Sequence, residues 1–153
     1  GLPWILYTGG ERKVFQPVAR LLGRDFVYGP TDCYALVKDA YHLAGIELPK
    51  IIRGDIDDDA KLERIPAGME EHFFKISDID FVEVGDVIVT ALGGKASHMA
   101  IYIGEGRVLH HQYNQMSLRE NLSEGWLKRI HSIWRHPDWK TECFEALEQD
   151  FGW

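Results

Sequence analysis

The sequence predicts a single α+β domain, with one strong helix in its first third and several short β-strands in its second half. The helix signal lies at residues 33–44, where apolar residues recur at three- and four-residue spacing. After Glu83 the pattern changes to short β-rich runs separated by glycine turns. Helices that come first and strands that follow favour helices packed on an antiparallel sheet.

Length and composition bound the class of protein. A chain of 153 residues with 45% hydrophobic residues suits one domain, which can form a core without disulfides. The net charge of −7 opposes nucleic-acid binding. The uncharged stretches are shorter than the ~20 residues of a membrane span, so none is expected. The N-terminus shows neither a signal peptide nor an initiator methionine, which leaves open that the chain is a fragment.

The helical elements have local signals. Residues 12–22 have mixed three- and four-residue apolar spacing, which predicts a short amphipathic helix. Thr31 and Asp32 are good N-cap residues for the helix that follows, and Gly45 supplies its C-terminal stop. Residues 70–76 could form a short helix or a strand.

The strands have turn signals between them. Residues 104–106, Gly-Glu-Gly, form a good three-residue loop between the runs at 99–103 and 107–109, which predicts an antiparallel hairpin. Residues 130–134 give a further β-rich run. The acidic residues 55–59 suggest a calcium loop, but Ala60 and Pro66 stand where an EF-hand needs glycine and glutamate. A solvated acidic loop is expected there.

Three residues have types and places that suit nucleophilic catalysis: Cys33, His98 and His110. Cys33 begins the predicted helix, where the helix dipole and unpaired backbone amides can stabilise a thiolate and lower the thiol pKa. His98 opens a strand after a flexible loop, so it can accept the thiol proton and return it to a leaving amine. The sequence therefore predicts a thiol–imidazole pair.

The two histidines should be neighbours across the predicted hairpin. With its centre near Glu105, residues 98 and 110 lie two places off direct opposition, on the same face of adjacent strands. His110 is then placed to orient the His98 ring and fix its tautomer. Alternation turns His111 to the opposite face, where a structural or solvent-facing role is expected.

Other interpretations stay open for these residue types. A lone buried cysteine is more often a small hydrophobe than a nucleophile. Three histidines and a cysteine could instead ligate zinc, but no HExxH motif or close cysteine pair supports this, and we expect no metal or cofactor. Cys143 lacks a helix-start signal and is expected to be inert. A structural role is expected for His42, His72, His131 and His136.

Three separated motifs resemble those of the NlpC-type papain-like cysteine peptidases of bacterial cell walls. They are residues 28–37 with an Asp-Cys pair, residues 84–87 with Gly-Asp, and residues 98–110 with a histidine at each end. In that family the cysteine is the nucleophile, the first histidine is the base, and a polar residue on the next strand orients it. Cys33, His98 and His110 fall on these places.

The departures from the family pattern resemble one branch of it. Tyr34 and Ala35 replace the common serine and glycine, and the turn before Asp32 is short. These features resemble the NlpC-type domains of phage tail-tip assembly proteins. The resemblance implies a papain-like fold with the nucleophile helix on an antiparallel sheet. It also implies three parts: an N-terminal extension or linker with a short helix (1–22), the peptidase domain (23–137), and a C-terminal tail or docked helix (138–153).

The resemblance implies hydrolysis of an amide bond in the peptidoglycan stem peptide by a component of the phage tail tip. Its partners would be that peptide and other tail-tip proteins, and it would act at the bacterial cell wall. Substrate or oxyanion contacts would come from Tyr28, Asp32 and Tyr34. Two alternatives are a structural tail-tip protein with little or no peptidase activity and a secreted bacterial cell-wall hydrolase.

Overall fold

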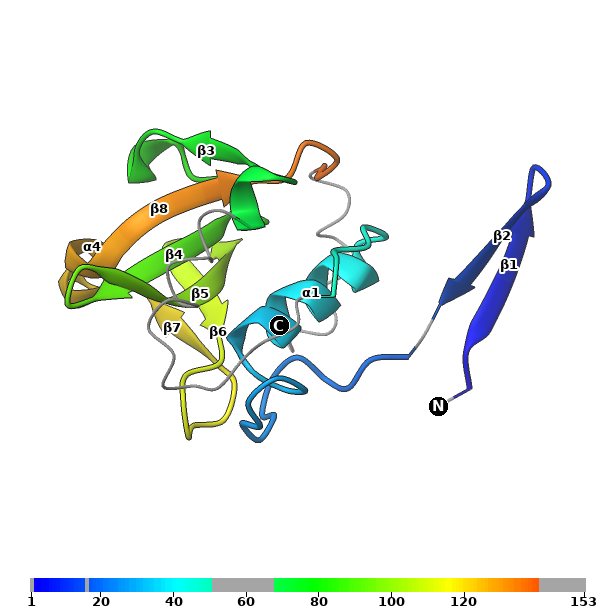
Figure 1. Ribbon diagram of the computed structural model, residues 1–153, viewed down its shortest axis with the longest axis horizontal. Helices are drawn as coiled ribbons and strands as arrows, with labels where there is room; N and C mark the ends of the chain where they lie inside the picture. The colour runs from blue at the N-terminus through cyan, green and yellow to red at the C-terminus, as the bar shows by residue number, and fades with distance from the viewer. Residues whose placement is uncertain (1, 16, 51–67, 141–153) are drawn as a thin grey trace.

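A computed structural model of the chain describes residues 2–15, 17–50 and 68–140. Its main body is a six-stranded antiparallel sheet with strand order β3-β8-β4-β5-β6-β7. The strands are β3 (Phe74–Ile76), β4 (Val87–Leu92), β5 (Lys95–Gly104), β6 (Arg107–His110), β7 (Leu118–Asn121) and β8 (Ile130–Arg135). Helix α1 (Cys33–Leu43) lies on one side of the sheet, and the short helix α4 (Glu124–Arg129) precedes β8 (Figure 1). The predicted α+β fold, with the cysteine helix packed on an antiparallel sheet, is confirmed.

Helix α1 begins and ends where its sequence signals lie. The Asp32 side chain accepts a hydrogen bond from the backbone N–H of Ala35 at 3.0 Å, which is N-cap geometry. Gly45 has a φ of +83°, and its N–H donates to the carbonyl of His42. This left-handed conformation suits glycine and ends the helix.

Strand alternation gives the sheet two apolar faces. On one face, buried side chains of β4, β5, β6 and β8 form a cluster with Leu36, Val37, Ala40 and Tyr41 of α1. The sheet residues of this cluster are Val87, Val89, Ala96, Met99, Ile101, Ile103, Leu109 and Trp134. On the other face, a smaller cluster contains Ile88, Ala100, Val108, Ile133 and Trp126 of α4. Successive residues of β4 and β5 therefore point to opposite clusters, as expected of strands buried on both faces.

The β5–β6 hairpin has the predicted register with a tighter turn. Ala100 pairs with His110 and Ile101 with Leu109, so His98 lies two places off direct opposition to His110. Pairing extends to Gly104 and Arg107, so the loop has two residues, Glu105 and Gly106, in place of the predicted three. Both have positive φ, 51° and 67°, as a type I′ turn requires. The strand pairing shifts register between Tyr102 and Gly104, and this shift accommodates the shorter loop.

The helix predicted at residues 12–22 is wrong. The structure instead has a hairpin of β1 (Trp4–Thr8) and β2 (Glu11–Phe15), and residues 17–22 are not helical. Its turn is Gly9-Gly10, with φ of +57° and +83°, which suits a two-residue hairpin. Pro17 also interrupts a helix in this window. In Figure 1 the hairpin stands apart from the six-stranded sheet.

The Gly-Asp motif before β4 is a packing site. Gly85 has a φ of +94°, and a Cβ on it would come within 1.9 Å of the Trp139 ring. Asp86 is buried and accepts two hydrogen bonds from Arg135, Nε to Oδ1 at 2.9 Å and Nη2 to Oδ2 at 2.8 Å. This paired contact joins the start of β4 to the end of β8.

Some predicted segments lie partly or wholly outside the described residues. The acidic residues 55–59 are among them, and so are residues 141–153 of the predicted tail, including Cys143. Of the two forms open for residues 70–76, a strand forms at Phe74–Ile76. The proposed domain boundaries stay predictions.

Candidate active site

The segment that leads into Cys33 is held by its own side chains. Asp32 is 1% exposed, and its carboxylate accepts from the backbone N–H groups of Gly29 at 2.8 Å and Ala35 at 3.0 Å. These bonds fix the turn at Gly29 and the first turn of α1 together. Asp32 therefore caps helix α1, and neither of these bonds directs its carboxylate to a substrate.

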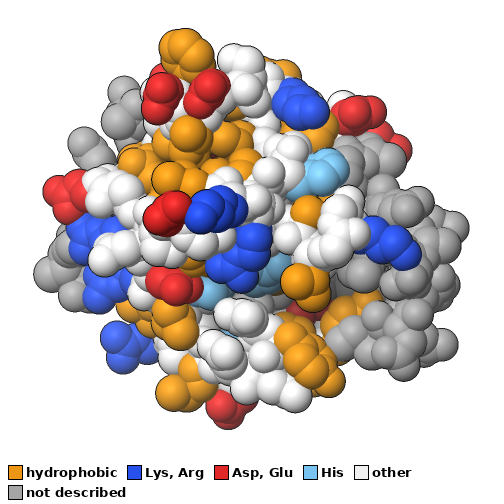
Figure 2. Space-filling model, turned by 90° about the vertical axis from the view of Figure 1, so that its left-hand side faces the viewer, with side chains coloured by type: hydrophobic (Ala, Val, Ile, Leu, Met, Phe, Trp, Pro, Cys, Tyr) orange, Lys and Arg blue, Asp and Glu red, His pale blue; other side chains and the backbone are white. Residues whose placement is uncertain are grey.

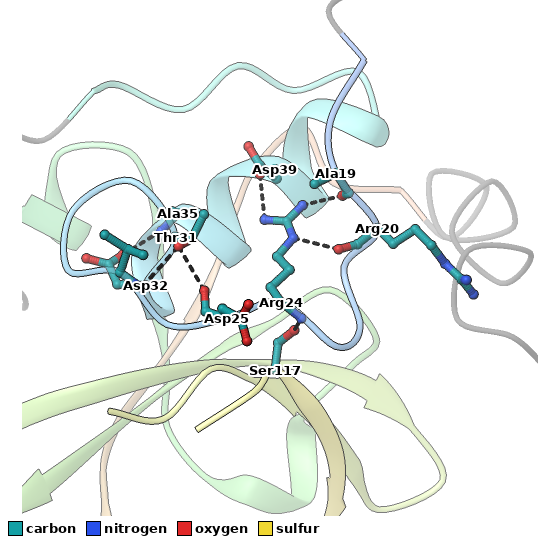
Figure 3. Close-up of polar contacts among 10 residues, drawn as sticks. Ala19, Arg20, Arg24, Asp25, Thr31, Asp32, Ala35, Asp39 and Ser117 are labelled. Carbon is teal, nitrogen blue, oxygen red and sulfur yellow. Dashed lines mark hydrogen bonds and ion pairs between the residues drawn. The ribbon is translucent and has the colours of Figure 1, made fainter. Parts of the chain in front are cut away.

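Arg24 ties this segment to the rest of the domain (Figure 3). It is buried, and its guanidinium donates to Asp39 of α1 at 2.7 Å and to the carbonyls of Arg20 and Ala19. Its backbone N–H donates to the Ser117 hydroxyl at 2.8 Å, just before β7. The loop preceding Cys33 is thereby anchored both to α1 and to the sheet edge.

The sulfur of Cys33 lies against the start of α1 and the backbone of β5. The backbone N–H groups of Met99, Tyr34 and Cys33 favour the thiolate, but burial outweighs them and raises the pKa of the Cys33 thiol. The predicted lowering of this pKa by the helix start is therefore wrong for the molecule as it stands, because desolvation penalises the charged form more. The resting group is a neutral thiol.

His98 and His110 form a hydrogen-bonded pair. His98 Nε2 lies 3.1 Å from His110 Nδ1, and the rings meet edge to face with centroids 5.2 Å apart. Trp126 of α4 packs against both rings, at 6.1 Å and 5.0 Å between centroids. The hairpin register and this aromatic contact together hold the pair in one arrangement.

The environment keeps the His98 ring neutral. Burial lowers its pKa to about 3, and the positive charge available to His110, Arg129 and His111 acts in the same direction. Burial also lowers the pKa of His110, while the charge of Glu120 opposes that shift. A neutral imidazole can accept a proton, so His98 is in the form that a general base requires.

The Cys33 sulfur contacts the backbone of β5 next to His98, while the His98 ring packs against Trp126 on the face of the sheet away from α1. The Cys33 sulfur faces the N–H of Met99, one residue after His98. No hydrogen bond joins the Cys33 thiol to the His98 ring, and both residues lie in the described part of the chain. Catalytic hydrogen bonds are often long or poorly aligned before substrate binds.

Glu120 is a neighbour of the pair that the sequence did not reveal. Its Oε2 atom lies 2.9 Å from His110 Nε2, and this contact favours a proton on that nitrogen. Val108 pairs with Glu120 and His110 with Leu118, which makes Glu120 and His110 diagonal neighbours on one face. Residues 118–121, Leu-Arg-Glu-Asn, have no strand pattern, so β7 was not predicted.

The predicted substrate contacts have different surroundings. The Tyr34 hydroxyl donates to the carbonyl of Pro49 at 2.6 Å, and burial raises its pKa to about 12. Its side chain therefore packs within the domain, while its backbone N–H faces the sulfur of Cys33. Tyr28 is 37% exposed before the cysteine turn, and its role in holding an oxyanion stays a prediction.

The other histidines whose contacts the structure describes pair or pack with residues of the same domain. His111 is fully buried, with its ring 5.2 Å from that of Phe26, so the solvent-facing alternative is wrong. His42 pairs with Glu47, and His136 accepts from the N–H of Asp138. Across the residues that the structure describes, no three metal-binding side chains gather in a metal-holding group. In the same residues no helix is long and apolar enough to cross a membrane.

Helix α4 places an aromatic and a cationic side chain next to the histidine pair. In Figure 2, which faces the left-hand side of Figure 1, histidine side chains reach the surface near the middle of the face beside Lys and Arg side chains. Arg129 of α4 is exposed and lies with its guanidinium carbon 5.7 Å from the Trp126 ring centroid. The histidine pair is therefore covered by Trp126 and flanked by a cation.

The structure is thus an α+β domain with a cysteine at the start of a helix and a histidine pair on neighbouring strands, as the sequence motifs predicted. The chain belongs to the NlpC/P60 family, whose model matches residues 23–135. Tail tip assembly protein K of Escherichia phage lambda is 38% identical over 154 residues, covering 97% of this chain and 75% of that protein. The family resemblance drawn from the motifs is confirmed.

Solved structures share the fold. An NLP/P60-family protein similar to lipoprotein, from Staphylococcus aureus, has a TM-score of 0.53 and 22% identity over 76% of this chain and 37% of its own. An NlpC/P60 family protein from Bacillus cereus has a TM-score of 0.57 and 17% identity over 88% of this chain and 50% of its own. The chain thus spans half or less of these two proteins, and the likeness shows the fold.

Proposed function

We propose that this chain is a cysteine peptidase that hydrolyses amide bonds in peptidoglycan stem peptides as a component of a phage tail tip. The observation that carries the proposal is the neutral, hydrogen-bonded pair of His98 and His110 next to the strand backbone that contacts the Cys33 sulfur. Family membership supports the peptidase class, and the tail tip assembly relative supports the location.

The reaction follows from the protonation states. The Cys33 thiol gives its proton to His98 as the sulfur attacks the amide carbonyl, and a carbon–sulfur bond forms. Backbone N–H groups at the start of α1 and the Tyr28 hydroxyl stabilise the oxyanion. The carbon–nitrogen bond then breaks as His98 returns the proton to the amine. Water, deprotonated by His98, attacks the thioester, releases the carboxylic acid and restores the thiol.

A thiol and an imidazole that are both neutral favour proton transfer together with attack. The raised pKa of Cys33 and the lowered pKa of His98 disfavour a preformed thiolate–imidazolium pair. The nucleophile is then activated by an adjacent base and not by a low thiol pKa. His110 holds the ring of His98 during both transfers.

The proposal is tested by digestion of purified sacculi. Wild-type protein should release muropeptides with shortened stem peptides, identified by mass spectrometry, and Cys33→Ala should release none. Release by both proteins would contradict the role of Cys33.

The name of the lambda relative favours one second candidate, a structural tail-tip component. Normal tail assembly with Cys33→Ala, together with no release by the wild-type protein, would favour that candidate.

A further inference from the structure

A contact between buried His110 and the carboxylate of Glu120 extends the histidine pair by one residue. His110 is 2% exposed and uses both ring nitrogens: Nδ1 faces His98 Nε2 at 3.1 Å, and Nε2 faces Glu120 Oε2 at 2.9 Å. The three side chains come from β5, β6 and β7, which are adjacent in the sheet. They form one row across the strands, His98, His110, Glu120, with the carboxylate at its far end.

The row restricts which nitrogen carries each proton. An ionised carboxylate can only accept, so it favours a proton on the nearest nitrogen, His110 Nε2. A neutral His110 then has its lone pair on Nδ1 and must accept from His98. His98 consequently carries its proton on Nε2 and has a free lone pair on Nδ1. The opposite tautomer of His110 would place an unprotonated nitrogen against the carboxylate, which is repulsive.

From this row we infer that Glu120 is a positioning residue, which sets the tautomers of His110 and His98 and so leaves His98 Nδ1 as the nitrogen that takes the Cys33 proton. The assignment of Nδ1 as the acting base rests on the proposed function, while the tautomers themselves do not. The contact suffices to set the tautomer of His110, because a full negative charge 2.9 Å from Nε2 stabilises a proton on that nitrogen.

Other groups near His110 do not supply the same preference. Arg129 and His111 are cationic or neutral, and both act against a positive charge on His110. Among the described residues, Glu120 is the anionic group whose charge acts on that ring. Its side chain is 46% exposed, so water reaches the carboxylate while one of its oxygens contacts the buried nitrogen.

The tautomers can be measured directly in the full chain. Long-range 1H–15N NMR spectra distinguish a protonated Nε2 from a protonated Nδ1 in each histidine ring. In the wild-type protein we expect the spectra to show the proton on Nε2 in both His98 and His110. In Glu120→Ala, His110 should lose this preference and populate the Nδ1–H form. Glu120→Gln can still accept through its amide oxygen and should retain a partial preference.

A matched control separates this effect from a general loss of negative charge. Glu124→Gln removes an acid from exposed α4, where its partner is Lys128, and should leave both tautomers unchanged. Unchanged tautomers in Glu120→Ala, with circular dichroism showing a folded protein, would overturn the inference. Because this spectrum needs no turnover, it decides the point even if the protein proves inactive on stem peptides.

A kinetic measurement tests the consequence for catalysis. With an active wild-type protein, kcat of Glu120→Ala should fall about tenfold or more while KM stays nearly constant, since the lost contact orients the base. Glu120→Gln should recover most of that loss. A rise in KM at unchanged kcat would contradict a positioning role and indicate a contact with substrate.

Discussion

His98 Nε2 lies 3.1 Å from His110 Nδ1, and this bond gives the two histidines unequal positions in the candidate site. His98 is next to the residue whose N–H meets the Cys33 sulfur, whereas His110 is 2% exposed between His98 and Glu120. In the proposed mechanism, His98 meets the reacting atoms and His110 holds the His98 ring. The following expectations depend on this difference.

Replacing His98 should cost more than replacing His110. His98→Asn removes the group that moves the proton, so peptidase activity on a stem peptide should fall to background. His110→Asn keeps a hydrogen-bonding side chain next to His98 and should retain measurable turnover. Initial rates of the folded variants decide this, with His131→Ala, on an exposed part of β8, as a control near wild-type activity. Equal loss in both Asn variants would contradict the division of roles.

Alkylation of Cys33 should keep accelerating at high pH. Burial raises the pKa of this thiol above its ordinary value of 9.0, so the reactive thiolate accumulates only in alkaline solution. The iodoacetamide rate at Cys33, followed by peptide mapping, should still be rising at pH 9. A plateau reached by pH 7 would show a stabilised thiolate and would restore the expectation drawn from the helix start.

Stability should fall as the solution is acidified below about pH 6.5. In the unfolded chain His98 has the ordinary pKa of 6.5, and in the folded domain its pKa is about 3. Between these values the unfolded state binds a proton that the folded state does not, so the free energy of unfolding decreases as pH falls. One such group contributes at most about 1.4 kcal/mol per pH unit. His110, His111 and His136 shift in the same direction.

Urea unfolding at pH 7 and pH 5 measures this dependence. His98→Gln should lose less stability over that interval than the wild-type protein. An equal loss in both proteins would mean that His98 titrates alike in the folded and unfolded states.

The contact between Asp86 and Arg135 should be important for stability. Asp86 is 1% exposed, so Arg135→Ala leaves a buried carboxylate without its cation and should cost about 3 kcal/mol. Arg135→Lys keeps the charge but lacks the two parallel donors and should recover only part of the loss. Arg107→Ala, which breaks an exposed ion pair with Glu105, should change the free energy of unfolding by less than about 1 kcal/mol. A similar small effect of Arg135→Ala would contradict this account.

The sequence predicted the elements with strong local signals. Helix α1 has an N-cap at Asp32, a regular apolar face and a glycine stop. The sequence therefore predicted both of its ends to within one residue. The β5–β6 register followed from a glycine turn between two β-rich runs, and with it the meeting of His98 and His110. These features depend on neighbours in the chain or across one hairpin.

The features that the sequence missed depend on tertiary contacts or on an ambiguous pattern. The apolar residues from Val14 to Leu22 have helical spacing, but the Gly9-Gly10 turn joins two paired strands there. Strand β7 has no β-rich composition and forms only by pairing with β6, so Glu120 could not be placed beside His110. The raised pKa of Cys33 results from burial among residues far apart in the sequence.

The central claim is that the Cys33 sulfur forms a covalent acyl intermediate with the substrate. The most direct test is intact-protein mass spectrometry after acid quenching during turnover of a synthetic stem peptide, with peptide mapping of any adduct. The account predicts a mass increase equal to the acyl half of the peptide, located on Cys33 and absent in Cys33→Ala. Cleavage of the peptide by Cys33→Ala at the wild-type rate, with no adduct in either protein, would contradict it.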